Sequence, residues 1–122
     1  MRLIDLEARF LQFRGTDQDD YGWRTVTDIS VATGVMFLCP KCFAHNKGPI
    51  NTHSVVCHRF GHVPDWAAPK PGRWVFEGTG LADLTLNAPP GFTRSIQLTG
   101  GGTCGGGSAW HGFVTNGQAS TV

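Results

Sequence analysis

Short apolar runs separated by glycine, proline and asparagine dominate the hydrophobic pattern of this chain. Runs of about four to eight residues bounded by turn residues are typical of β-strands rather than helices. The strands predicted in this way are 23–26, 35–38, 53–57, 73–77, 83–87, 94–98, 111–115 and 118–122. The last two flank Asn116-Gly117, a dipeptide that favours a tight hairpin turn. We therefore expect a mostly β protein with at most one or two short helices, in which the strands between 73 and 98 form an antiparallel meander.

Four segments need separate interpretation. Residues 3–13 satisfy both a helical stripe and a strand alternation, and we favour a strand. Residues 15–22 are polar and glycine-bounded, so they predict a loop, and their aspartates do not complete a calcium-binding pattern. Asp28 suits the N-cap of one or two helical turns that end at Gly34. Residues 63–72 contain three prolines, which predict an extended loop without a helix.

Length and charge narrow the class of protein. The chain has 122 residues, enough for one core, so we expect a single domain spanning residues 1–122. The formal net charge is +1, and the basic residues are scattered rather than clustered. Because nucleic-acid binding relies on a basic patch that displaces counterions, this charge argues against a nucleic-acid partner.

The chain carries no apolar stretch near the eighteen or so residues needed to span a bilayer. Its first fifteen residues contain acidic and basic side chains, which is unlike a secretory signal peptide. We therefore expect neither secretion by a signal peptide nor membrane insertion. In a reducing cytoplasm, four cysteines are better explained as thiols or metal ligands than as disulfides.

The pair Cys39-Pro-Lys-Cys42 has the spacing of a zinc knuckle, which needs two further ligands from elsewhere in the chain. We favour Cys104 and His111 as these ligands. Glycines on both sides of Cys104 allow the backbone to wrap closely around an ion. His111 follows Trp110 at the start of a predicted strand, where its neighbours would hold the imidazole in one orientation. The sequence thus predicts a structural zinc ion that staples the two halves of the fold.

Other ligand sets stay open. Cys57 with His62 or His58 would complete a continuous local finger with the Cys39–Cys42 pair. A redox dithiol is a further alternative, but such a pair should open a helix. Residues 43–51 are rich in Asn, Gly and Pro, and we expect no helix there. His45 and His58 are assigned ordinary hydrogen-bonding roles.

Five short sequence motifs occur together in this chain, and in combination they resemble a family of small zinc-knuckle proteins encoded by tailed bacteriophages and prophages. They are Val35-Met-Phe-Leu-Cys-Pro-Lys-Cys-Phe-Ala44, His53-Ser-Val-Val-Cys57, Pro71-Gly-Arg-Trp74, Gly78-Thr-Gly-Leu-Ala-Asp-Leu-Thr-Leu86 and Trp110-His-Gly-Phe-Val-Thr-Asn-Gly117. The resemblance covers most of residues 27–119 and implies a phage origin, hence a location in the host bacterial cytoplasm or in the virion, but no particular activity. Family members carry a cysteine close before the Trp-His-Gly-Phe string, usually as Cys-Gly-Trp-His, whereas Gly-Gly-Gly-Ser-Ala separates Cys104 from Trp110 here. That departure keeps the 53–57 step open as a source of ligands.

The function expected from these features is that of a non-catalytic, zinc-stabilised structural or interaction protein. It would be a virion component or an accessory factor that binds a phage or host protein. Trp66, in the proline-rich loop, is the best candidate for a residue that contacts this partner. The oligomeric state is left open.

Two alternatives belong to other classes. A zinc hydrolase would need an open metal position and a carboxylate base, for which His53, His62 and Asp65 are the residues to inspect. A zinc-knuckle nucleic-acid binder would use basic residues on phosphates and an aromatic ring on a base. The residues considered for that role are Lys41, Arg73, Arg94 and Trp74.

Overall fold

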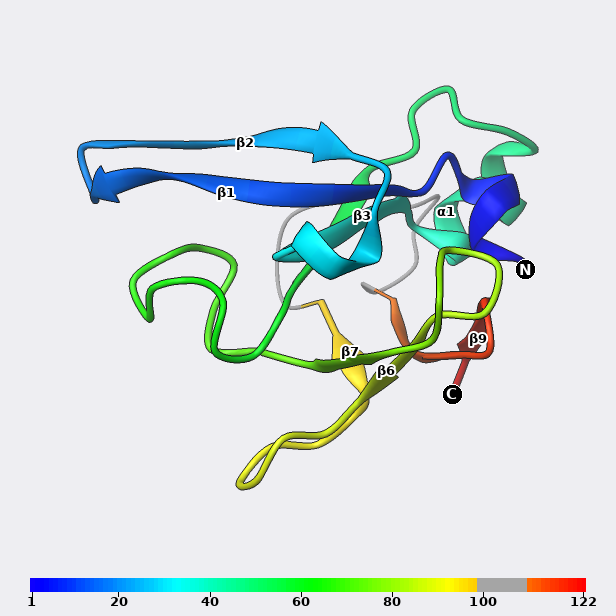
Figure 1. Ribbon diagram of the computed structural model, residues 1–122. Helices are drawn as coiled ribbons and strands as arrows, with labels where there is room; N and C mark the ends of the chain where they lie inside the picture. The colour runs from blue at the N-terminus through cyan, green and yellow to red at the C-terminus, as the bar shows by residue number, and fades with distance from the viewer. Residues whose placement is uncertain (99–109) are drawn as a thin grey trace.

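The computed structural model describes residues 1–98 and 110–122 and is mostly β (Figure 1). Its strands are β1 (Arg9–Asp17), β2 (Asp20–Val26), β3 (Gly34–Leu38), β4 (Ser54–His58), β5 (Val75–Glu77), β6 (Thr85–Asn87), β7 (Ile96–Gln97), β8 (His111–Thr115) and β9 (Gln118–Thr121). Two short 3₁₀ helices, η1 (Leu3–Leu6) and η2 (Ile29–Val31), and one α-helix, α1 (Pro40–Asn46), complete the described elements. The predicted fold class, β-rich and antiparallel with few short helices, is confirmed.

The largest sheet has the strand order β2-β1-β3-β4, with all neighbours antiparallel. Side chains alternate between the two faces along each strand, and one of these faces is buried. The buried face contributes Phe10, Val35, Phe37, Val55 and Cys57 to the core. β5 and β6 form a separate two-stranded sheet, and β7, β8 and β9 form a third.

One continuous cluster of buried residues joins these sheets, and it includes side chains from η1 at the start of the chain and from β9 near its end. Trp110 is fully buried and meets Phe37 edge to face, with ring centroids 5.9 Å apart. The two termini lie on the same side of the molecule (Figure 1), where the Met1 amino group donates to the Ala119 carbonyl at 2.8 Å. The core therefore links segments that are far apart in sequence.

The predicted hairpin turn at Asn116-Gly117 is confirmed. Both residues have positive φ, 49° and 76°, as a two-residue turn that matches the twist of the strands requires. The turn also contacts other elements, because the Leu3 N–H donates to the Gly117 carbonyl at 2.9 Å and the Gly117 N–H donates to the Leu84 carbonyl at 2.8 Å. This local signal in the sequence therefore marks a tertiary junction.

The loop predicted for residues 15–22 is wrong. β1 continues to Asp17 and β2 begins at Asp20, so only a two-residue turn separates them. The strands form a long hairpin that extends beyond β3 in Figure 1, since β3 pairs with β1 only from Arg9 to Leu11. The polar composition of this segment reflects an exposed hairpin rather than a loop.

Other expectations were met in part. Residues 3–13, expected as a strand, begin as the 3₁₀ helix η1 and become β1 only at Arg9. The Asp28 carboxylate caps η2 by accepting from the Ser30 N–H at 2.9 Å, as expected. All three strands predicted between 73 and 98 form, but they are not one meander, because β7 pairs with β8 instead of β6.

No helix within residues 1–98 and 110–122 is long and apolar enough to cross a membrane.

The proline-rich segment 63–72 is an irregular loop, as predicted. Arg73, only 7% exposed, organises it by donating hydrogen bonds to backbone carbonyls. The acceptors are Pro64 (2.9 Å), Ala67 (3.1 Å), Pro69 (3.0 Å) and Gly72 (2.8 Å). The buried His58 imidazole adds a contact between its Nε2 and the Ala68 carbonyl at 2.9 Å. The loop is thus held by two side chains from its base.

Candidate metal centre

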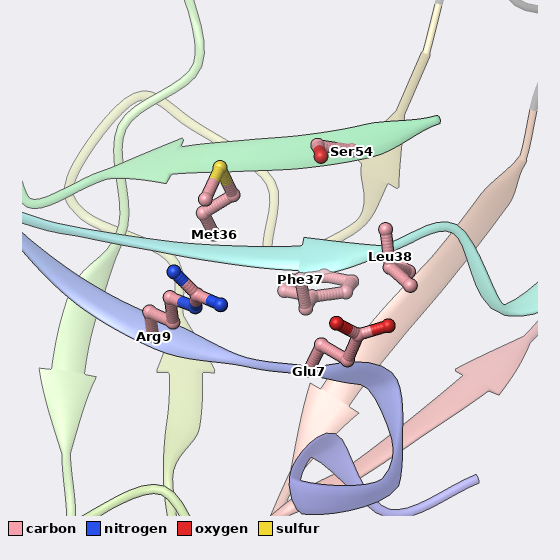
Figure 2. Close-up of a pocket in the computed structure, with 6 residues that line it drawn as sticks. All are labelled: Glu7, Arg9, Met36, Phe37, Leu38 and Ser54. Carbon is pink, nitrogen blue, oxygen red and sulfur yellow. The ribbon is translucent and has the colours of Figure 1, made fainter. Parts of the chain in front are cut away.

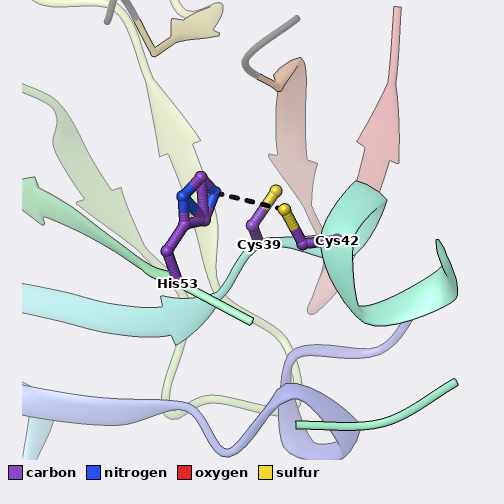
Figure 3. Close-up of side chains that lie close together, drawn as sticks. All are labelled: Cys39, Cys42 and His53. Carbon is purple, nitrogen blue, oxygen red and sulfur yellow. Dashed lines mark hydrogen bonds between the residues drawn. The ribbon is translucent and has the colours of Figure 1, made fainter. Parts of the chain in front are cut away.

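The side chains of Cys39, Cys42 and His53 converge where β3, α1 and the start of β4 meet (Figure 3). Their ligand atoms all lie within 4.8 Å of one another. Both cysteines are essentially inaccessible to solvent, at 0% and 1% exposure, and His53 is half-buried. The described part of the chain therefore brings together two cysteine sulfurs and one imidazole that could hold a metal ion.

The end of β3 and the start of α1 position the two cysteines. Cys39 follows the last residue of β3 and is the N-cap of α1, with an extended backbone at φ −58° and ψ 121°. Pro40 occupies the first helical position, where its fixed φ suits the helix and its missing N–H costs nothing. Cys42 then lies in the first turn of α1, which places its side chain beside that of Cys39.

The pairing of β3 with β4 delivers His53. Leu38 lies opposite Ser54 in the antiparallel ladder, so the next residue on each strand continues the pairing. Accordingly, the Cys39 N–H donates to the His53 carbonyl at 2.8 Å. The backbone hydrogen bond fixes the histidine directly across from the first cysteine.

The turn between α1 and β4 is held by its own hydrogen bonds. The Thr52 hydroxyl donates to the Gly48 carbonyl at 2.7 Å, and the Asn46 side-chain amide donates to the Asn51 carbonyl at 3.1 Å. Lys47 has a left-handed backbone with φ 56° that ends the helix. These contacts give the chain a defined return path from Cys42 to His53.

The geometry of the group suits a tetrahedral zinc ion. Zn–S bonds of about 2.3 Å and Zn–N bonds of about 2.0 to 2.1 Å place sulfur and nitrogen about 3.6 Å apart across a tetrahedral angle. The Cys42 Sγ and His53 Nε2 atoms are 3.7 Å apart. Two sulfur ligands and one nitrogen ligand match the preference of zinc rather than that of magnesium or calcium. The donor set and its spacing therefore fit zinc.

We expected all four cysteines to be thiols or metal ligands, and Cys42 differs from this expectation. Its sulfur is disulfide-bonded in this structure, whereas Cys39 and Cys57 are free. A metal takes cysteine only as the thiolate. Zinc binding by this group therefore requires the reduced chain.

The predicted ligands Cys39 and Cys42 belong to this group, whereas Cys104 lies in residues 99–109, outside the described part of the chain. His111 begins β8 and is half-buried, and it is not one of the three residues brought together here. The set of Cys39, Cys42, Cys104 and His111 stays a prediction. The sequence offers His53 only as an alternative ligand. Its place beside Cys39 depends on how β3 pairs with β4, and no short stretch of sequence signals that register.

The residues of the local-finger alternative lie elsewhere. Cys57 is fully buried on the core face of β4, where burial raises the pKa of its thiol. His58 contacts the Ala68 carbonyl, and the exposed His62 contacts the Phe60 carbonyl through Nδ1 at 2.9 Å. None of these three belongs to the group around Cys39 and Cys42 within the described residues.

The expectation that no helix follows the CxxC pair is wrong, since α1 covers Pro40–Asn46. Two features let a helix form here despite the composition. Proline is favoured at the first helical position, and the glycine and second proline of this segment fall after Asn46. The argument against a redox dithiol therefore loses its structural basis, although the adjoining His53 still favours a metal.

The residues proposed for hydrolysis are not assembled. Neither His62 nor Asp65 joins His53 in a potential metal-binding group among residues 1–98 and 110–122. A pocket of about 230 Å³ opens beside β3, where the side chains of Glu7 and Arg9 lie next to this strand (Figure 2). Met36, Phe37, Leu38 and Ser54 complete its lining. None of the three metal-binding candidates lines this pocket.

The aromatic and basic residues considered for partner binding have internal contacts. Trp66 is half-buried and packs edge to face on Phe13 and Tyr21, with centroids 5.8 and 5.1 Å apart. Trp74 is 8% exposed, and its indole N–H donates to the Arg94 carbonyl at 3.1 Å. The Arg94 guanidinium in turn donates to the Val114 carbonyl at 3.1 Å. Contact of Trp66 with a partner stays a prediction.

Compared with models of protein families, with curated proteins and with solved structures, the chain matches none.

Proposed function

We propose that this chain is a zinc-stabilised structural or interaction protein of bacteriophage origin, without catalytic activity. The convergence of Cys39, Cys42 and His53 supports the metal, and the burial of both cysteines supports a structural role. A catalytic zinc keeps an open position beside a general base. No aspartate or glutamate joins the group within the described residues. The phage origin is supported by the sequence resemblance.

The energetic argument for a structural ion is strong in a chain of this size. Zinc binding contributes roughly 10 to 16 kcal/mol in zinc-finger peptides, as much as the whole stability of many domains. Here the ion would tie α1 to the ends of β3 and β4. Cys104 is our candidate for the fourth ligand, because a third thiolate would complete a common structural set of three cysteines and one histidine.

Elemental analysis of the protein, purified with a reductant so that the cysteines are thiols, tests the metal. We expect one zinc per chain, lost in Cys39→Ser, Cys42→Ser and His53→Ala but retained in Cys57→Ser, which removes a buried thiol outside the group. Zinc loss in Cys104→Ser would support the fourth ligand. Full zinc retention in both Cys39→Ser and His53→Ala would overturn the site.

Mass spectrometry of purified particles and of infected cells tests the biological role. Recovery of the chain from particles indicates a virion component, and recovery in a complex with a host protein indicates an accessory factor. Zinc-dependent hydrolysis of a substrate by the purified protein would overturn the non-catalytic role.

A further inference from the structure

The outer half of the β1–β2 hairpin is a two-stranded arm with an unpaired edge. β2 is the outermost strand of its sheet, so no strand in the described part of the chain pairs with its outer side. β3 does not pair with β1 beyond Leu11. Thr33, the residue before β3, adds one contact, because its hydroxyl accepts from the Phe13 N–H at 2.7 Å. Isolated two-stranded hairpins are marginal in water, and exposed strand edges invite further pairing.

The two faces of β2 differ in chemistry. Tyr21 and Trp23 share one face, contact each other with centroids 5.3 Å apart, and remain 39% and 36% exposed. Asp20, Gly22 and Arg24 alternate with them and therefore share the opposite face. The strand thus combines exposed aromatic surface with one acidic and one basic residue placed symmetrically about Gly22.

We propose that β2 pairs antiparallel with β2 of a second copy of this chain, about a two-fold axis at Gly22. In this register, Asp20 lies opposite the partner's Arg24, and Arg24 lies opposite the partner's Asp20. Tyr21 lies opposite the partner's Trp23, so the aromatic faces of the two copies continue into each other. The result is an eight-stranded sheet with an isologous interface.

Charge complementarity selects this register and this occupant. Shifting the axis to Tyr21 or Trp23 places Asp20 or Arg24 opposite an uncharged residue or moves it beyond the end of the strand. Strand edges are often protected by charged side chains such as lysine, and like charges directly opposite each other are destabilising. Here the opposite charges of Asp20 and Arg24 match each other when the strand meets its own copy in the antiparallel direction.

The shape of the hairpin is compatible with this approach. A Cβ placed on Gly22 would meet nothing within 4 Å, so the sheet face at the proposed axis is open. The Arg24 Nε atom donates to the Gln12 side chain at 2.7 Å, which holds the guanidinium over the polar face of the hairpin. In Figure 1 the outer edge of β2 faces away from the other strands. The proposal does not rest on the metal or on the proposed function.

Sedimentation equilibrium of the full chain over a concentration series tests the pairing. We expect a reversible monomer–dimer equilibrium whose dissociation constant rises about tenfold or more in Asp20→Arg and in Arg24→Asp, because each creates two like-charge pairs. The double variant D20R/R24D restores two opposite pairs and should dimerise like the original chain. Asp19→Arg, with the same charge change in the turn, is the matched control and should leave the dissociation constant unchanged.

Mixing the two single variants gives the sharpest outcome. The arginine introduced at position 20 of one variant would face the aspartate introduced at position 24 of the other, and the unchanged Arg24 and Asp20 would also face each other. The mixture should therefore form heterodimers although each variant alone is weakened. A chain that stays monomeric at every concentration would overturn the proposal, as would a dimer that neither single variant weakens. Zinc content measured on the same samples separates this outcome from failure of the metal site.

Discussion

The Cys39 N–H donates to the carbonyl of His53 at 2.8 Å, and this backbone hydrogen bond places a histidine beside a CxxC pair. The bond extends the β3–β4 ladder by one position past Leu38 and Ser54. A potential metal ligand is therefore supplied by strand pairing rather than by spacing along the chain. Any change that shifts this register would move His53 away from the two sulfur atoms.

Replacement of His53 and of His111 distinguishes the two candidate histidines. We expect His53→Ala to weaken zinc binding by more than the roughly 10- to 100-fold that loss of an outer hydrogen-bonding partner costs, because a direct ligand disappears. Competition with a chromogenic chelator measures the affinity. If His111→Ala loses as much zinc affinity as His53→Ala or more, His111 is a ligand. If His111→Ala keeps full zinc affinity, His111 is not a ligand.

His58 predicts a pH dependence of stability that does not involve the metal. Burial, assisted by the nearby Arg73 charge, lowers the pKa of His58 from its ordinary 6.5. The unfolded chain then binds a proton more readily than the folded chain does. The free energy of unfolding should therefore fall as the pH drops below about 6.5, by at most about 1.4 kcal/mol per pH unit from this group.

Urea unfolding of the original chain and of His58→Phe, each measured across this pH range, checks the prediction. The variant loses the contact with the Ala68 carbonyl, a cost of about 1 to 3 kcal/mol that does not depend on pH. The difference in stability between the two proteins should narrow as the pH falls. A difference that is constant across the range would contradict the role of His58.

Arg73 predicts a second stability effect, at the proline-rich loop. Arg73→Met removes a guanidinium that donates to several buried or part-buried backbone carbonyls, and we expect the free energy of unfolding to fall by about 2 to 4 kcal/mol. Arg73→Lys should recover only part of this, because an ammonium cannot reproduce the planar fork of donors. Chemical denaturation gives the stability. Full recovery by lysine would show that charge alone holds the loop.

Gly117 predicts the cost of altering the hairpin turn. A Cβ at this position would approach the backbone of Ala82 far inside van der Waals contact, and φ is 76°. We expect Gly117→Ala to destabilise the protein by about 2 to 4 kcal/mol in thermal or chemical unfolding. Gly80→Ala is the matched control, since a Cβ there meets nothing within 4 Å. Similar losses in both variants would mean that the turn geometry is not the cause.

Local signals in the sequence were sufficient for several features. The Asn116-Gly117 turn, the Asp28 cap, most of the strands and the Cys39–Cys42 half of the site depend on residues within a few positions of one another. Such features follow from backbone preferences and short-range hydrogen bonds. The polar composition of residues 15–22 led to the wrong prediction of a loop. Most residues in this outer part of the β1–β2 hairpin are exposed, so the strands there lack the apolar pattern that marks a buried strand.

By itself, then, the sequence determined that the chain is β-rich and that two cysteines form one half of a potential metal site. Only the tertiary structure decided that β7 pairs with β8 and that His53 stands beside those cysteines. Both depend on which strands pair and in which register. Pairing between distant strands is selected by the total burial and hydrogen bonding of the folded chain, and no short stretch of residues encodes that total.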